Sequence, residues 1–80
     1  VKLEIVTTEE TIFSDDVDIV IAPGAEGQLG ILPRHASLLT ALNSGDIVGR
    51  KDGQESVIKV DGGFLEVARD HVRVLANSNQ

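Results

Sequence analysis

The feature of this sequence that most constrains its fold is an alternation of apolar and polar residues with a period of two. The pattern runs through residues 1–5 (VKLEI), 16–22 (DVDIVIA) and 72–74 (VRV). Successive side chains of a β-strand point to opposite faces, so this period predicts half-buried strands. In the segment 16–22 it predicts a shared buried face for three side chains, Val17, Ile19 and Ile21. We therefore expect strands at both ends of the chain.

Turn signals separate the apolar segments at short intervals. They are Pro23-Gly24, Asn43-Ser44-Gly45, Asp52-Gly53 and Asp61-Gly62-Gly63. Asp52-Gly53 gives the strongest hairpin prediction, because a type I′ turn needs two residues that tolerate positive φ. Many short strands joined by such turns are typical of an all-β sandwich or barrel.

Residues 34–45 (RHASLLTALNSG) allow two interpretations. A proline before them, leucines at 38, 39 and 42 and a glycine at the end are typical of a short helix. The same residues also suit a strand, and periodicity alone leaves the choice open. The sequence contains no repeat or linker, so we expect one domain over residues 1–76 and a tail over 77–80.

Composition excludes several classes of function. The chain has 13 acidic and 7 basic residues and a net charge of -6, which argues against nucleic acid as a partner. It has no cysteine, so disulfides and thiolate metal sites are excluded. No apolar run approaches the roughly 18–20 residues that span a bilayer. We expect any membrane association to be indirect, through a partner.

The residues that could carry chemistry do not form a catalytic or cofactor motif. Gly24, Gly27 and Gly30 are evenly spaced and lack both the lysine of a P-loop and the closely spaced glycines of a dinucleotide site. We interpret them as shaping the backbone. His35 and His71 lack a recognisable nucleophile and orienting partner. We predict no catalytic residue, no metal ligand and no cofactor, and for His35 a protein contact is as plausible as a passive surface position.

One stretch is informative for another reason. Residues 24–42 (GAEGQLGILPRHASLLTAL) closely resemble the glycine–glycine–LGI–proline–x–histidine–LLTAL signature of the ε subunit of rotary F-type ATP synthases. Residues 3–24 resemble that family's opening strands, and residues 62–76 its penultimate hairpin. Two positions depart from the family pattern, since Arg34 stands where glycine is usual and Ser37 where proline is usual.

The resemblance implies a flattened, ten-stranded β-sandwich of two packed, mostly antiparallel sheets, in which the leucine-rich segment is a strand. It implies a non-catalytic subunit of the central rotor that docks the γ subunit onto the membrane c-ring and couples proton flow to ATP synthesis. Such a subunit lies on the cytoplasmic, matrix or stromal face of an energy-coupling membrane. Family members usually continue into a C-terminal helical hairpin, and the sequence leaves open whether this chain is naturally short or a fragment.

The resemblance also assigns residues, one position at a time. It implies contact with γ for Thr7, His35 and Thr40 and contact with the c-ring for Glu26 and Gln28. The loop around the ring contact would be shaped by Gly24, Gly27, Gly30 and Pro33. The alternative is a free-standing small β-barrel that binds a ligand in its mouth or serves as an interaction module, although the sequence shows no converging polar groups for it.

Overall fold

The computed structural model describes residues 1–77, which form seven strands of a single sheet. The sheet order is β2-β1-β7-β6-β5-β3-β4, and every neighbouring pair is antiparallel except β1 with β7. The strands are β1 (Lys2–Val6), β2 (Thr11–Asp16), β3 (Ile19–Gly24), β4 (Gly27–Ile31), β5 (Leu38–Lys51), β6 (Gln54–Ala68) and β7 (His71–Ala76).

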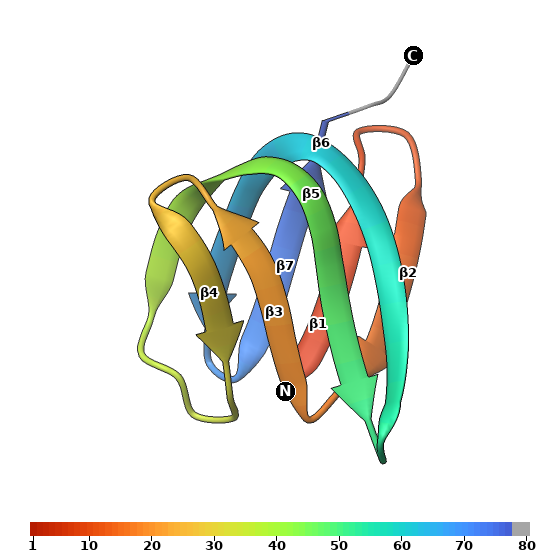
Figure 1. Cartoon of the computed structure of the whole chain (residues 1–80), viewed down its shortest axis with the longest axis vertical. Coiled ribbons are helices and arrows are strands. Elements are labelled where there is room, and N and C mark those ends of the chain that lie inside the picture. Colours follow the sequence, from red (N-terminus) through yellow and green to blue (C-terminus); the bar gives the residue numbers. More distant parts are fainter. Residues whose placement is uncertain (78–80) are drawn as a thin grey trace.

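Two long strands fold this sheet into two layers. Strands β5 and β6 pair with each other from end to end and arch across the top of the molecule in Figure 1. Residues 48–50 of β5 pair with β3, whereas residues 63–68 of β6 pair with β7. One layer therefore contains β3 and β4, the other contains β7, β1 and β2, and β5 and β6 belong to both.

The corner between the layers contains two of the predicted turns. Asn43-Ser44-Gly45 and Asp61-Gly62-Gly63 lie inside β5 and β6, where Leu42 pairs with Gly63 and Ser44 with Asp61. Gly62 and Gly63 have φ values of 93° and 136° and bend the strand without ending it. The fold is thus all-β, as predicted, but it has seven strands in one sheet where the resemblance implied ten in two. Strand pairing continues through the corner, so β5 and β6 each count as one strand. A break in pairing at the corner would have divided each of them into two strands.

The structure also shows the Asp52-Gly53 turn and the leucine-rich segment, about which the sequence raised expectations. Asp52 and Gly53 have φ values of 51° and 81° between the paired residues Lys51 and Gln54, which confirms the predicted hairpin and its I′-type backbone. Residues 38–51 form β5 and not a helix. Pairing with β6 along this whole segment outweighs its local helix signals, because tertiary context overrides weak propensity.

The interior is apolar throughout residues 1–77, where no polar or charged residue is buried. The alternation at both chain ends is confirmed, since Leu3, Ile5, Val72 and Val74 are fully buried. The whole core is Leu3, Ile5, Val17, Val20, Ala22, Ile31, Leu42, Ile47, Val60, Leu65, Val67, Val72, Val74 and Ala76.

The predicted buried face of residues 17–21 is wrong in part. Val17 is buried, but β3 buries Val20 and Ala22 and leaves Ile19 and Ile21 half-buried on the outer side. The alternation restarts because the chain bends at Asp18 before β3 begins. The Asp18 carboxylate is used locally there, where its Oδ2 accepts the N–H of Asp52 at 3.0 Å.

The predicted tail begins at a residue that is bonded to the corner. The N–H of Asn77 donates to the carbonyl of Gly62 at 3.1 Å, and its Nδ2 donates to the carbonyl of Asp61 at 3.1 Å. The other residues of the predicted tail, 78–80, lie outside the described residues. The division into a domain over 1–76 and a tail therefore stays a prediction.

Candidate functional site

The tip of the β3–β4 hairpin carries both residues assigned to the c-ring. Gly24 pairs with Gly27 and leaves Ala25 and Glu26 as a two-residue connection. The tip is fastened to β5, because the N–H of Ala25 donates to the carbonyl of Ala41 at 2.9 Å. Glu26 and Gln28 are both exposed. The structure therefore presents these two polar side chains together on an anchored tip.

The structural constraint that calls for glycine differs among the three glycines of this hairpin. Gly27 has a φ of 136°, a backbone conformation that favours glycine. A Cβ on Gly24 would lie 2.6 Å from the carbonyl oxygen of Gly27, so a side chain cannot fit there. Gly30 has neither constraint, because its φ is not in the left-handed region and a Cβ would meet nothing within 4 Å. The backbone therefore accounts for Gly24 and Gly27 but not for Gly30.

The corner after β4 is a turn through Pro33 and Arg34. Arg34 has a φ of 65°, so the left-handed conformation that glycine adopts freely is here taken by an arginine. The N–H of Arg34 donates to Oδ1 of Asp70 at 2.9 Å, and this bond holds the turn against the β6–β7 connection. The departure from the family pattern at this position thus leaves a glycine-type backbone in place.

The three residues assigned to γ do not form one cluster. Thr7 follows β1 at the end where Val6 pairs with Leu75. His35 follows the Pro33-Arg34 turn, at the opposite end of the β6–β7 ladder. Thr40 lies half-buried on β5 and pairs with Leu65. A single small contact cannot include all of them, because Thr7 and His35 lie at opposite ends of the layer and Thr40 shares its inner face with the buried Leu65.

Two of these side chains also have local roles. The Thr7 hydroxyl oxygen accepts the N–H groups of Glu9 and Glu10, each at 3.2 Å, and so closes the β1–β2 turn. Nδ1 of His35 lies 2.7 Å from the carbonyl oxygen of Ala36, and the ring is exposed. A threonine or histidine at these positions therefore serves the chain's own structure even without a partner.

One candidate surface was not located from the sequence. It is an apolar band formed by residues that face outward in one row across four strands, Ala41, Phe64, Leu75 and Val6. Phe64 is 56% exposed and Leu75 is 45% exposed, and Leu39 on the same face of β5 is 72% exposed. A signal for the band was present in the adjacent apolar pairs Phe64-Leu65 and Val74-Leu75. Since neighbours in a strand point to opposite faces, one member of each pair must face outward.

Polar side chains border the apolar band. Oε1 of Glu4 lies 3.3 Å from Nε2 of His71 and 3.5 Å from Nε of Arg73. Glu66 pairs with Arg73 on the adjoining strand. The outer face of this layer therefore has an apolar part and a polar flank, which is the common composition of a protein interface.

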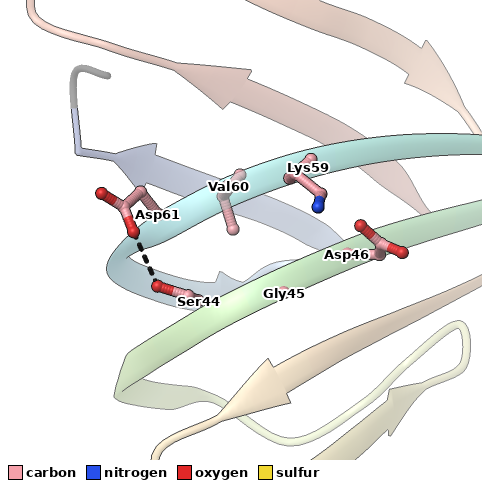
Figure 2. Close-up of a pocket in the computed structure, with 6 residues that line it drawn as sticks. All are labelled: Ser44, Gly45, Asp46, Lys59, Val60 and Asp61. Carbon is pink, nitrogen blue, oxygen red and sulfur yellow. Dashed lines mark hydrogen bonds between the residues drawn. The ribbon is translucent and has the colours of Figure 1, made fainter. Parts of the chain in front are cut away.

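The corner between the layers also carries a shallow pocket, shown in Figure 2. It has a volume of about 440 Å³ and is lined by Ser44, Gly45, Asp46, Lys59, Val60 and Asp61. The Ser44 hydroxyl donates to Oδ1 of Asp61 at 2.7 Å, and the Lys59 ammonium points toward the strand that carries Asp46. These polar groups are directed at each other across an open surface. A ligand-binding barrel would need polar groups that converge on an enclosed space.

Residues 1–77 contain no group of three or more histidine, cysteine, aspartate or glutamate side chains arranged to hold a metal ion. Within the same residues, no helix has the length and apolar character needed to cross a membrane.

These features define a small all-β domain with an apolar core, whose distinctive chemistry lies on its outer surfaces. The chain belongs to the family described as ATP synthase, Delta/Epsilon chain, beta-sandwich domain, which it matches over residues 1–80.

Individual relatives agree with this assignment. The ATP synthase epsilon chain of Dehalococcoides mccartyi (strain CBDB1) is 52% identical over 77 residues, which cover 96% of this chain and 55% of that protein. The epsilon chain of Pelotomaculum thermopropionicum is 48% identical and is covered to 58%. The chain thus spans little more than half the length of these relatives. A chain of the mitochondrial ATP synthase of Euglena gracilis has the same fold, with a TM-score of 0.85 at 22% identity over 92% of this chain and 48% of that one.

Proposed function

We propose that this domain is the docking part of a non-catalytic ε subunit, which joins the γ subunit to the c-ring in the central rotor of an F-type ATP synthase. In this role it couples proton flow to ATP synthesis by transmitting rotation, and it lies at the cytoplasmic, matrix or stromal face of the membrane through the complex. The main observation behind the proposal is the exposed apolar band on this chain, which belongs to the ATP synthase family described above. The related solved structure is described as an F1/c-ring assembly, which supports it.

The apolar band suits γ because a long-lived protein contact needs a buried apolar centre. Phe64 is the largest side chain of the band, and it lies between Ala41 and Leu75 in the row. Burying a phenylalanine side chain contributes about 1.5–3 kcal/mol, and interface energy concentrates in a few such residues. The polar side chains of Glu4, His71 and Arg73 beside the band would form the polar rim. Thr7 follows Val6 of the band and would lie at its end. Thr40 pairs with the buried Leu65 and so faces the inner side of the layer, away from the band.

Phe64→Ser is expected to weaken binding to γ by at least about tenfold, because it removes the central apolar anchor. Titration of γ with the chain, followed by calorimetry or fluorescence, measures the affinity. Val57→Ser is the matched control, since Val57 is 57% exposed on β6 but does not belong to the apolar band. Both variants should keep the wild-type thermal transition within a few degrees. A loss of affinity that is equal for the two variants would show that the apolar band is not the γ contact.

The hairpin tip suits the c-ring because it is polar, exposed and anchored. Gly27→Val is expected to weaken docking on the ring more than Glu55→Ala does. A branched side chain disfavours a φ of 136°, so the connection must change shape and displace Glu26 and Gln28. The measurement is the binding of γ together with this chain to membranes that contain the c-ring. The Glu55→Ala change removes only a surface ion pair with Arg50 and serves as control. Equal docking of the two variants would exclude a role for the tip.

A further inference from the structure

The two edge strands of the sheet differ in how they protect their unpaired side. At one edge, β2 ends in Asp15 and Asp16, and its pairing with β1 is interrupted by an irregularity between Ile5 and Val6. Charges and bulges are the usual devices that keep an edge from pairing with another chain. At the other edge, β4 (GQLGI) has no charged residue and pairs with β3 in an uninterrupted register. Strand β4 therefore lacks the protection that β2 has.

The direction of the free backbone groups of β4 follows from one proline. Pro23 pairs with Gln28, but it has no N–H, so this pair cannot exchange two hydrogen bonds. The hydrogen-bonded pairs are then the alternate ones, which include Gly24 with Gly27 and Ala22 with Leu29. It follows that the peptide groups of Gln28 and Gly30 point away from β3. Both residues are exposed.

Gly30 adds a space for a side chain at this edge. The fold gives no reason for a glycine there, because its φ is ordinary and a Cβ would meet nothing within 4 Å. Its missing side chain leaves an open pocket of about 270 Å³, lined by Ile19, Ile21, Gln28, Leu29 and Gly30. Three of the five lining residues are apolar, and Ile21 pairs with Gly30. The pocket therefore fits an apolar side chain that enters along β4.

We propose that β4 accepts an extended segment of a partner protein as an additional strand, which bonds to the peptide groups of Gln28 and Gly30 and places an apolar side chain in the pocket at Gly30. The net charge of -6 and the exposed Glu26 at the strand's end favour a segment with lysine or arginine. A second copy of the chain is disfavoured, because it carries the same negative charge and a five-residue edge offers too little area for a stable dimer. The inference rests on the proposed function, in which the partner is another subunit of the same complex.

Hydrogen exchange tests the strand addition directly. In the free chain, the amides of Gln28 and Gly30 should exchange rapidly, whereas those of Leu29 and Ile31 are already protected by β3. After the chain is assembled with γ and the c-ring, exchange at Gln28 and Gly30 should slow by at least about tenfold, because each amide gains a backbone partner. The amides of β2 are the internal control, and their exchange should change little.

A pair of variants tests the pocket. Gly30→Val should leave the urea midpoint of the isolated chain unchanged or higher, since the site is open and valine favours strands. It should nevertheless weaken assembly by at least about tenfold, because the valine occupies the space meant for the partner. Ser56→Val places the same side chain at an exposed position of β6, which β5 and β3 separate from β4, and should assemble as the wild type does.

The outcomes separate this inference from the proposed function. A chain that assembles with γ and the c-ring but keeps fast exchange at Gln28 and Gly30 supports the proposed function and overturns the strand addition. Equal assembly of Gly30→Val and Ser56→Val overturns the role of the pocket. Slow exchange at Gln28 in the isolated chain, together with a dimeric mass, would identify a second copy as the occupant. A chain that does not assemble at all overturns both proposals.

Discussion

Gly63→Ala is expected to lower the free energy of unfolding by at least about 3 kcal/mol, a large part of the roughly 5–15 kcal/mol that stabilises a small domain. Gly63 has a φ of 136° at the point where β6 bends between the layers. A Cβ on this residue would overlap the carbonyl oxygen of Leu75 and lie 3.0 Å from the Cα of Ala76. Both are backbone atoms of β7, so relief requires a shift of the strand and not of a flexible side chain.

Urea denaturation followed by circular dichroism measures this loss. Gly53→Ala is the matched control, because Gly53 also has a positive φ of 81° but a Cβ there would meet nothing within 4 Å. That variant should lose only the free energy that an alanine costs in the left-handed conformation, about 1–2 kcal/mol. If the two variants lose equal stability, close packing of β6 on β7 does not determine the need for glycine at 63.

Leu65→Ala is expected to lower the free energy of unfolding by about 2–5 kcal/mol. Leu65 is fully buried on β6, in a row that contains Val74 of β7 and Ile5 of β1. Truncation removes apolar contacts and leaves a cavity between strands that neighbouring side chains cannot fill without moving.

Leu39→Ala removes the same atoms from the outer face of β5, where Leu39 is 72% exposed. Its effect on stability should stay within about 0.5 kcal/mol. Equilibrium denaturation of the two variants gives the comparison. A similar loss in both would mean that the two faces of this layer are not divided into core and surface as described.

The fold class was predictable from the sequence because it depends on local patterns. The alternation in residues 1–5 and 72–74 identified strands and their buried residues, and Asp52-Gly53 identified a hairpin with its turn type. These features are determined by a few neighbouring residues. The resemblance to a family added what local patterns left open, namely that residues 38–42 are strand.

What could not be predicted depends on contacts between distant segments. Asn43-Ser44-Gly45 and Asp61-Gly62-Gly63 have the composition of turns, and only their pairing with each other shows that they form one corner. The buried face of β3 depends on the bend at Asp18, which changes the phase of the alternation by one residue. The apolar band requires the register of four strands to be known. The sequence contains its residues but not the row that they form.

The parallel pairing of β1 with β7 has a consequence for how the chain reaches its native state. The pairing joins the first strand of residues 1–77 to the last strand of that range, with Leu3 beside Val72 and Ile5 beside Val74. During synthesis, β1 can form a hairpin with β2 early, but its other edge and its contacts with Val72 and Val74 are not completed until β7 has been made. Such non-local closure is slow compared with hairpin formation. Strand β1 is therefore fixed only after β7 has formed, and until then the apolar side chains of the nascent sheet are open to chaperones and to aggregation.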